Sequence, residues 1–384
     1  MSVPTARGLF ANLPVAALDR QARLLRAGDD ALRAVCADAA TRCLLFCGLR
    51  PLVSSYAVMG GSPVHHRLTR VPVAAVAAVG VDIGAASAVL LGIEGVTDSS
   101  SARPLVAVDV TPPATAAGVD TATDGALVVA NLRSAGFLAV ADDEANTSYA
   151  FIDGRELIGA SAWRQAHHAA PSQLPSGPLP SGEVALFGLS RQLLQWHAKS
   201  RFCGSCGSVM TPIEGGMKKR CTSCRDIAYP RTDPVVIALV TSSDGERALL
   251  SRQAGFPPGV YSCCAGYVEP GETLEEAVVR ELREETSVEL AVEDVRYFAS
   301  QPWPLVRGAF GQIMVAATVC ARADDGRSAV AFDTDELSDA KWFTRAEVRA
   351  AIEWHTGGAG TPSLRVPGPF AIAHSLLATW SQDT

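Results

Sequence analysis

The 384-residue chain lacks any hydrophobic run long enough to cross a bilayer. Its most apolar stretch, residues 71–96, is interrupted by glycines and by Asp82 and Glu94. A surplus of basic residues is also missing, because 33 Lys and Arg stand against 40 Asp and Glu, giving a formal net charge of −7. This balance argues against a protein that holds nucleic acid on a broadly basic surface. With 48% hydrophobic residues, we expect a soluble protein of two or three domains that does not enter a membrane.

A secretory signal peptide is also missing, so we expect the ten cysteines to lie in a reducing compartment. The first 26 residues carry four arginines and one acidic residue, a composition faintly like that of a transit peptide. The last residues, Ser381–Thr384, do not form a peroxisomal signal of the SKL type. We expect a cytoplasmic protein, with the peroxisome and the mitochondrion as alternatives. The sequence shows no internal repeat.

Two CxxC pairs, separated by 14 residues, predict a zinc site. Four thiolates at this spacing match tetrahedral Zn²⁺. Two disulfides or a redox dithiol are the alternatives, and they are less favoured because no signal peptide and no thioredoxin-like βαβ pattern accompany the motif. Four thiolates leave no open coordination position, so this zinc should stabilise the fold and take no part in catalysis. The predicted ligands are Cys203, Cys206, Cys221 and Cys224.

An acidic motif lies between Gly266 and Val288, which reads GYVEPGETLEEAVVRELREETSV. Glu281, Glu284 and Glu285 stand at i, i+3 and i+4, so a helix would place them on one face. Like charges this close repel each other, but a divalent cation such as Mg²⁺ or Mn²⁺ would make the arrangement favourable. The alternative is a solvated acidic face, which the fixed spacing of glycine, glutamate and arginine makes the weaker interpretation.

Local signals predict a helix for this motif. Pro270-Gly271 indicates a turn, and Thr273 with Glu276 three residues later forms a capping-box pattern. The side chains expected to pack the helix against the core are Leu274, Ala277, Val278 and Leu282.

The motif resembles the Nudix box, G-x5-E-x7-R-E-U-x-E-E-x-G-U with U an aliphatic residue, at every defining position but one. Ser287 stands where the family has glycine, after the helix, where a positive φ is easiest without a Cβ. Serine in that conformation costs about 1 kcal/mol of backbone strain. Because no metal ligand is lost, we expect an effect on stability or loop geometry and not on the chemistry.

Twelve residues beyond the box, Ser300–Pro304 reads SQPWP. Together with the box and the preceding cysteines, this segment is similar to the NADH pyrophosphatase subfamily, whose array is SQPWPFPxS. The chain continues with Leu305, Val306 and Gly308 where the array has phenylalanine, proline and serine. These departures bear on the shape of the nucleotide pocket and on substrate preference. Arg307 adds a cation, for which solvent exposure is favoured over a phosphate contact.

The resemblance covers most of the chain and is weakest over residues 60–184. It implies an α/β protein with an N-terminal mixed α/β, Nudix-like domain over 1–170, a linker and helix over 171–199, a zinc ribbon over 200–230 and a Nudix α/β/α sandwich with a mixed sheet over 231–384. Within the N-terminal part most of five apolar segments are expected to be strands, namely 44–49, 73–83, 88–93, 104–110 and 125–132.

The resemblance implies metal-dependent hydrolysis of the pyrophosphate bond of NADH and NAD⁺ to nicotinamide mononucleotide and AMP, carried out by a homodimer whose site is completed across the interface. The carboxylates of Glu281, Glu285 and Glu336 and the carbonyl of Ala265 would hold Mg²⁺ or Mn²⁺. Glu284 or Glu285 would orient or deprotonate the attacking water, and the sequence does not choose between them.

Neighbouring residues take supporting roles under the same resemblance. We expect Arg280 to fix the glutamates through ion pairs, and Glu272 to serve the helix and loop or to hold an outer-shell water. Tyr229 and Tyr267 would stack on a flat base, although ordinary packing is the alternative from the residues alone. The other expected substrate contacts are Gln301, Pro302, Trp303, Pro304, Leu305, Val306, Arg307, Gly308 and Ala373.

Two other functions remain open. The first is removal of NAD caps from RNA 5′ ends by the same cleavage, for which Lys218–Arg220 could supply a local basic patch. The second is a non-catalytic scaffold that binds partners through the zinc ribbon, with a degenerate Nudix domain. The substitution Glu285→Gln would separate these classes, because an enzyme would lose activity and a scaffold would keep its binding.

Overall fold

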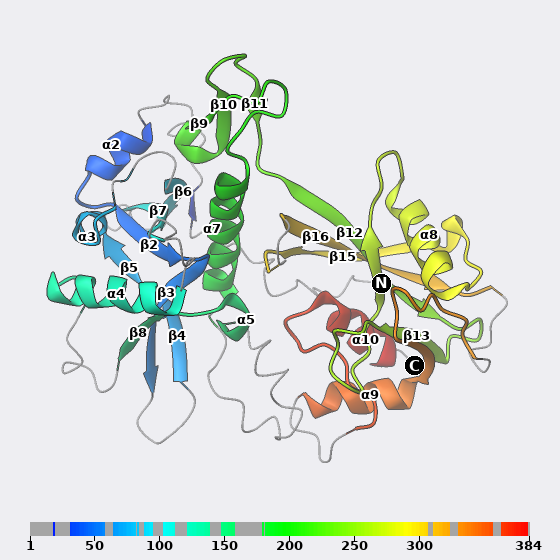
Figure 1. The fold of residues 1–384 in the computed structure, drawn as a ribbon. Coiled ribbons are helices and arrows are strands. Elements are labelled where there is room, and N and C mark those ends of the chain that lie inside the picture. The colour runs from blue at the N-terminus through cyan, green and yellow to red at the C-terminus, as the bar shows by residue number, and fades with distance from the viewer. Residues whose placement is uncertain are drawn as a thin grey trace.

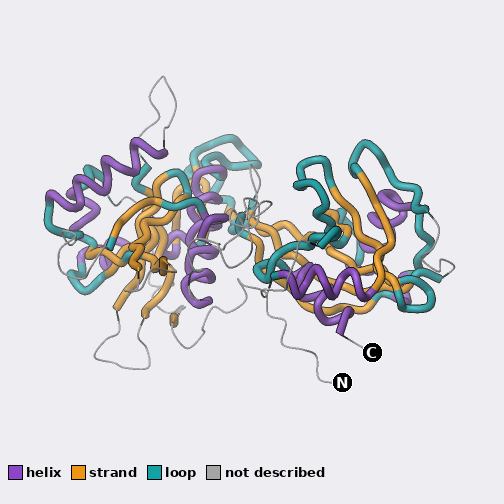
Figure 2. The backbone as a smooth tube through the Cα atoms, turned by 90° about the horizontal axis from the view of Figure 1, so that it is seen from below, coloured by secondary structure: helices purple, strands orange, loops and turns teal. Residues whose placement is uncertain are grey.

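The computed structural model describes residues 18–19, 31–57, 64–81, 83, 88–94, 103–111, 121–138, 147–157, 179, 181–305, 310–322, 329–355 and 362–382. Within these residues two lobes, each built on a β-sheet, flank the long helix α7 (Ser181–Lys199), and a small zinc ribbon sits above that helix (Figure 1). Figure 2 shows from a second direction that strands and helices gather in two separate bodies. No helix in the described part of the chain is long and apolar enough to span a membrane.

The C-terminal lobe is an α/β/α sandwich with a mixed sheet, as predicted. Its six-stranded sheet runs β15-β16-β12-β13-β17, with β14 paired to β12, and β12 and β16 are its parallel pair. The strands are β12 (Thr232–Thr241), β13 (Arg247–Arg252), β14 (Cys264–Tyr267), β15 (Arg296–Trp303), β16 (Gly311–Cys320) and β17 (Asp339–Thr344). The helices are α8 (Leu274–Thr286), the 3₁₀ helix η4 (Val292–Asp294), α9 (Arg345–Trp354) and α10 (Ile372–Gln382).

Alternation along β12 explains the two layers of helices. Val236, Ala238 and Val240 point to one face, where they pack with α8. Ile237 and Leu239 point to the other, where they pack with α9 and α10. Because both faces are buried, β12 reads in the sequence as an uninterrupted apolar run.

The N-terminal lobe is also built on a mixed sheet. Its order is β1-β6-β7-β2-β3-β4, with β5 paired to β2 and β8 paired to β3. The strands are β1 (Leu18–Asp19), β2 (Arg42–Cys47), β3 (Arg50–Ala57), β4 (Val64–Leu68), β5 (Arg70–Pro72), β6 (Ala88–Glu94), β7 (Arg103–Asp109) and β8 (Ser148–Phe151). One face packs against α2 (Ala31–Ala37), α3 (Ala74–Ala78) and α4 (Thr121–Ser134), and the other against α7, next to the short helix α5 (Gly154–Leu157).

Three of the five apolar segments expected as strands are confirmed by β2, β6 and β7. The other two segments contain the helices α3 and α4, so the expectation that most of the five are strands is confirmed. In α4 the buried positions are Gly125, Val128, Val129 and Leu132, which is the helical spacing i, i+3, i+4, i+7.

The two lobes share one topology although no repeat is visible in the sequence. The path β6-β7-β2-β3-β8, with β5 on β2, follows the same strand order as β15-β16-β12-β13-β17, with β14 on β12. The pair β2–β7 is parallel, as is β12–β16, and the remaining matched pairs are antiparallel. In chain order α3 takes the place of α8, but its sequence is AAVAA. The carboxylate-bearing helix therefore belongs to the C-terminal lobe alone among the described elements.

The zinc ribbon consists of β9 (Met210–Ile213), the 3₁₀ helix η3 (Glu214–Gly216), β10 (Lys218–Cys221) and β11 (Ile227–Ala228). It docks on the end of α7 through Lys219, whose Nζ donates to the carbonyls of His197 at 2.9 Å and Ser200 at 2.8 Å. A cation bonded to the last carbonyls of a helix stabilises that helix end. The expected basic patch at Lys218–Arg220 is therefore wrong in part, because Lys219 is buried and Lys218 pairs with Glu214 at 2.9 Å.

Candidate active site

The box helix α8 begins at the predicted capping box. The Thr273 side chain accepts from the backbone N–H of Glu276 at 3.2 Å, and the Glu276 carboxylate accepts from the N–H of Thr273 at 2.8 Å. Ala277, Val278 and Leu282 are buried as expected. Leu274 is 39% exposed and does not join them, so its inclusion in the apolar face is wrong. The helix is thus fixed at its start and along one face, which sets the positions of its glutamates.

The helix ends in the strained conformation expected at Ser287. This residue has φ 53° and ψ 17°, and its N–H donates to the carbonyl of Arg283. The left-handed region is costly for a residue with a Cβ, and glycine is the usual solution. Ser287 keeps the geometry of the family's glycine and carries the strain.

Arg280 holds the acidic cluster together, as predicted. Its guanidinium contacts both carboxylate oxygens of Glu272, at 2.5 and 2.9 Å, and it donates to Glu281 at 3.0 Å and Glu284 at 3.2 Å. It also donates to the carbonyl of Tyr267 at 2.9 Å. These bonds raise the pKa of Arg280 above its ordinary value, with the bond to Glu272 as the largest cause. Glu272 therefore serves the loop and the arginine, one of the two roles expected for it.

Glu285 is the buried member of the cluster. It is 3% exposed, and its Oε2 has no hydrogen-bond partner. Burial, with smaller contributions from the charges of Glu281 and Glu336, raises its pKa to about 7 against the lowering effect of a bond with Cys264. Burial likewise raises the pKa of Glu281, although Arg280 opposes the shift. The structure thus places Glu281, Glu285 and Glu336 near enough to one another for the charge of Glu336 to raise the pKa of both Glu281 and Glu285.

Glu284 takes a different position from Glu285. Its side chain is 62% exposed, and its carboxylate accepts the 3.2 Å bond from Arg280. Glu336 is also exposed, in the turn before β17, yet its charge acts on Glu281 and Glu285. Of the two glutamates proposed to act on water, the structure therefore buries one and leaves the other in solvent.

Gly266 makes room for Glu281. A Cβ at Gly266 would lie 1.9 Å from Cδ of Glu281 and about as close to both carboxylate oxygens. The backbone of β14 cannot retreat freely, because Gly266 pairs with Val236 and Ala265 pairs with Ile237 on β12. The first glycine of the box is thus a steric requirement of the carboxylate that packs on it.

These residues fit a hard divalent cation. A buried carboxylate oxygen without a partner, beside two further carboxylates, is a costly arrangement that a cation would make favourable. The carboxylates are more spread out than the cysteines, however. Among the described residues one group has all its ligand atoms within 4.8 Å of one another, and it consists of Cys203, Cys206, Cys221 and Cys224.

The cysteine group has the geometry of the predicted Cys₄ site. The Sγ atom of Cys206 lies 3.4 Å from that of Cys221 and 3.5 Å from that of Cys224. The Sγ atoms of Cys203 and Cys224 are 3.6 Å apart. Sulfur atoms around a tetrahedral Zn²⁺ would be of this order apart. The site is closed on all sides by thiolates and lies in the ribbon, away from the glutamates.

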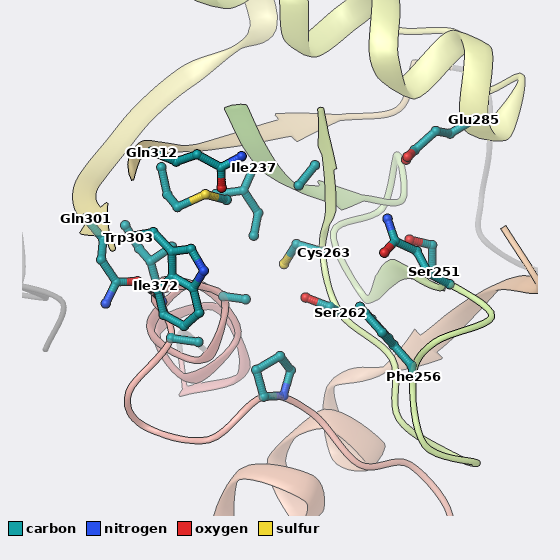
Figure 3. Close-up of a pocket in the computed structure, with 16 residues that line it drawn as sticks. Ile237, Ser251, Phe256, Ser262, Cys263, Glu285, Gln301, Trp303, Gln312 and Ile372 are labelled. Carbon is teal, nitrogen blue, oxygen red and sulfur yellow. Dashed lines mark hydrogen bonds between the residues drawn. The ribbon is translucent and has the colours of Figure 1, made fainter. Parts of the chain in front are cut away.

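A cavity of about 350 Å³ leads from Glu285 to the SQPWP strand. Figure 3 shows Glu285 at one end, Gln301 and Trp303 at the other, and Cys263 between them. Its size is at the lower end of the range for ligand sites in proteins. It also contains two residues expected by resemblance, Ala265 and Ala373. One channel therefore joins the acidic cluster to an aromatic, largely apolar pocket.

Gln301 fixes the far wall of this cavity. It is 1% exposed, its Nε2 donates to the carbonyl of Phe370 at 2.9 Å, and its Oε1 accepts from the N–H of Ile372 at 2.8 Å. The side chain thereby joins β15 to the start of α10. Pro302, the next residue on β15, is half-buried and is not among the cavity residues.

Several expected substrate residues lie elsewhere. Tyr229 is 62% exposed on the ribbon side, with Lys218 over its ring at 5.3 Å, and Tyr267 reaches the cavity edge through a 2.5 Å bond to Gln312. Leu305 leaves the cavity altogether and is buried in the core of the N-terminal lobe. Pro304 is buried outside the cavity, and Val306, Arg307 and Gly308 lie outside the described residues.

Sequence reasoning missed most of the residues that line the cavity. Phe256, Ser262 and Cys263 line the wall opposite Trp303, and Gln312 lines the mouth. Gln312 and Met314 share a face of β16 by the two-residue alternation of a strand, a signal that was available in the sequence. Phe256, Ser262 and Cys263 precede β14 in a loop, where no local pattern marks which side chains point into the cavity.

Two family models match this chain. The model of the NUDIX domain matches residues 231–360, and that of the NADH pyrophosphatase zinc ribbon domain matches residues 198–229. The chain belongs to the Nudix hydrolases of the NADH pyrophosphatase type, a family that requires divalent metal ions.

Three curated relatives show the extent of the likeness. NAD-capped RNA hydrolase NudC of Mycobacterium bovis (strain BCG / Pasteur 1173P2) is 36% identical over 246 residues, which cover 59% of this chain and 74% of that protein. Nudix hydrolase 19, chloroplastic, of Arabidopsis thaliana is 37% identical over 264 residues, 60% of this chain and 56% of that protein. NAD-capped RNA hydrolase NUDT12 of Homo sapiens is 36% identical over 242 residues, 60% and 49% respectively. The chain thus spans about half the length of the last two.

Proposed function

We propose that this protein hydrolyses the pyrophosphate bond of NADH and NAD⁺ to nicotinamide mononucleotide and AMP, with Mg²⁺ or Mn²⁺ as cofactor. The observation that carries the proposal is the cavity that joins Glu285 to Gln301 and Trp303. Cleavage of a dinucleotide needs carboxylates that hold metal ions beside its bridging phosphates, and an apolar, aromatic wall for a flat base. This cavity offers both at opposite ends.

The carboxylates of Glu281, Glu285 and Glu336 and the carbonyl of Ala265 would hold the metal ions. When bound, such ions neutralise phosphate oxygens and lower the pKa of a bound water. We assign Glu285, and not Glu284, to accept the proton of the attacking water, because Glu285 lines the cavity and its buried Oε2 has no hydrogen-bond partner, whereas Glu284 is 62% exposed. Arg280 keeps Glu281 in place through its 3.0 Å bond, and in this proposal it does not contact the substrate.

Recognition of the base falls to the far end of the cavity. The ring of Trp303 lines that wall. Tyr267 lies beside the cavity, where its hydroxyl accepts a hydrogen bond from the lining residue Gln312. Tyr229 lies outside the cavity of its own chain and is 62% exposed. We therefore propose that its expected stacking role is fulfilled in the site of a second copy of the chain, within a homodimer.

A product assay with wild type and Glu285→Gln tests the proposal. NADH, NAD⁺, ADP-ribose and a diadenosine polyphosphate are offered at millimolar Mg²⁺ or Mn²⁺, and AMP is measured. We expect AMP release from NADH and a loss of at least about 10²-fold in kcat for Glu285→Gln, the range of a positioned general base. Glu275→Gln is the matched control, because Glu275 is an exposed glutamate in the first turn of the same helix.

Three results would count against the proposal. Preference for another nucleoside diphosphate derivative would retain the chemistry and refute the NADH assignment. No turnover of any substrate, with partner binding through the ribbon, would favour the non-catalytic scaffold. An equal loss in Glu285→Gln and Glu275→Gln would point to a fold defect instead of a catalytic role.

Removal of NAD caps from RNA is the second candidate. Two of the relatives above carry the name NAD-capped RNA hydrolase, and the bond cleaved would be the same. The local basic patch is weaker than its sequence indicates, because Lys219 is buried. Comparing kcat/KM for NADH and for a short NAD-capped RNA decides between them. A ratio strongly in favour of the capped RNA would make decapping the main activity.

A further inference from the structure

The segment that follows β15, the strand of Gln301 and Trp303, is buried in the core of the other lobe. After Trp303 the chain enters the N-terminal lobe, where Leu305 is 3% exposed and packs in a cluster with Leu157 and Phe187. Trp303 and Phe370 border the same cluster. The wall of the cavity is therefore continuous with a hydrophobic core that belongs to a different sheet.

Gly154 leaves the space that Leu305 needs. A Cβ at Gly154 would lie 2.3 Å from the ring of Phe187 and 2.8 Å from Cδ2 of Leu305. The adjacent Arg155 donates through Nη2 to the carbonyl of Leu305 at 3.3 Å. Leu305 is thus held by close packing of its side chain and by a hydrogen bond to its backbone.

Arg191 on α7 makes a second connection between the lobes. Its Nε donates to the carbonyl of Pro304 at 3.0 Å, and its Nη1 donates to the carbonyl of Leu49 at 2.7 Å. Leu49 lies in the turn between β2 and β3, so one guanidinium bridges the N-terminal sheet and the end of the SQPWP segment. A planar guanidinium can donate in two directions at once, which a lysine cannot do in the same geometry.

The same helix also lies against the other strand of the cavity wall. A Cβ at Gly311 would be 2.4 Å from Cδ of Gln192, so α7 packs closely on the start of β16. The next residue, Gln312, lines the cavity. One helix of the N-terminal lobe therefore supports both strands, β15 and β16, that form the far wall.

Among the described residues, the helix at the catalytic end packs within its own lobe. Helix α8 packs on β12 and β14 inside the C-terminal lobe, and Ala277, Val278 and Leu282 bury their side chains there. A disturbance of α7 should therefore move the base-binding wall and leave the carboxylates in place.

We propose that the N-terminal lobe is a positioning element for the substrate pocket, with Arg191 as the positioning residue and Leu305 as the anchor. The lobe sets the affinity for the substrate while α8 sets the rate of its chemistry. The proposal rests on the proposed function for the identity of the substrate, NADH, but the placement of the wall can be measured without activity.

The test compares Arg191→Met, Arg191→Lys and Leu305→Ala with the control Arg133→Met. Arg133 is an exposed arginine on α4, and its guanidinium lies over the Tyr149 ring of its own lobe. We expect Arg191→Met and Leu305→Ala to raise KM for NADH about tenfold with kcat within about twofold, the pattern of lost binding without lost chemistry. Arg191→Lys should recover part of the affinity, and Arg133→Met should match wild type.

Hydrogen exchange of the peptide covering residues 296–303 is the second readout. It should speed up in Arg191→Met and Leu305→Ala and stay unchanged in Arg133→Met. Unchanged KM and unchanged exchange in Arg191→Met and Leu305→Ala would overturn the proposal. A fall in kcat as large as the rise in KM would also overturn it. If wild type fails to cleave NADH, the proposed function fails, and the exchange measurement alone still supports or overturns the positioning role.

Discussion

The substitution Gly266→Ala tests the geometry of the acidic cluster directly. The added methyl carbon would stand 1.9 Å from Cδ of Glu281, whereas ordinary contacts begin near 3.4 Å. The carboxylate would therefore have to retreat by about 1.5 Å, since β14 is held by its pairing with β12. Such a move would also break the 3.0 Å bond from Arg280.

The expected size of the effect follows from that displacement. A misplacement of about 1 Å in a catalytic group costs roughly 10²-fold in rate. We therefore expect Gly266→Ala to lower kcat/KM for NADH by at least about 10²-fold, or about 2.7 kcal/mol of transition-state stabilisation. Affinity for the activating metal should fall as well, because Glu281 is one of its proposed ligands.

The assay measures kcat/KM for NADH at several Mg²⁺ concentrations, alongside circular dichroism and thermal unfolding. Gly255→Ala is the matched control, because a Cβ at Gly255 would meet nothing within 4 Å. If Gly266→Ala keeps its activity within about threefold of wild type, with unchanged metal affinity, Glu281 does not need its observed position. The assignment of Glu281 as a metal ligand would then be refuted.

Three further predictions concern stability. Ser287→Gly should raise the Tm by about 1–3 °C, because relief of about 1 kcal/mol of strain outweighs the added entropy of the unfolded chain, and Ser287→Ala should not. Cys206→Ser should lose the bound zinc, seen by metal analysis, and lower the Tm; full zinc content would disprove the ligand set. Burial lowers the pKa of His355 to about 4, so its neutral form stabilises the fold above pH 6.5 and this stability is lost as the pH falls towards 4. His355 alone should contribute about 2 kcal/mol to the fall in the free energy of unfolding between pH 7.5 and pH 5, so His355→Gln should reduce that fall by about this amount in urea unfolding; an unchanged pH dependence would contradict this account.

The box helix and the zinc ribbon could be predicted because each depends on residues close together in the sequence. The cap at Thr273 and the left-handed Ser287 follow from local backbone chemistry. The four cysteines meet because two short knuckles suffice to bring them together.

The remaining features depend on contacts between distant segments. Leu305 follows a motif associated with nucleotide binding, but the space left by Gly154 draws it into the other lobe. Lys219 is buried because two carbonyls at the end of α7 accept hydrogen bonds from its ammonium group, which no count of basic residues can show. Glu284 and Glu285 are neighbours of the same type, and the cavity on one side of α8 distinguishes them.

The shared strand order of the two lobes has a consequence for how relatives of this protein are found. The helix that follows β14 carries charged residues whose spacing is fixed by chemistry, whereas the one that follows β5 is AAVAA. A search guided by residue identity therefore registers one lobe, and the NUDIX domain match indeed covers residues 231–360. The N-terminal lobe has the same strand order without the same residues. Lobes related in this way are better identified by comparing strand order than by comparing sequence.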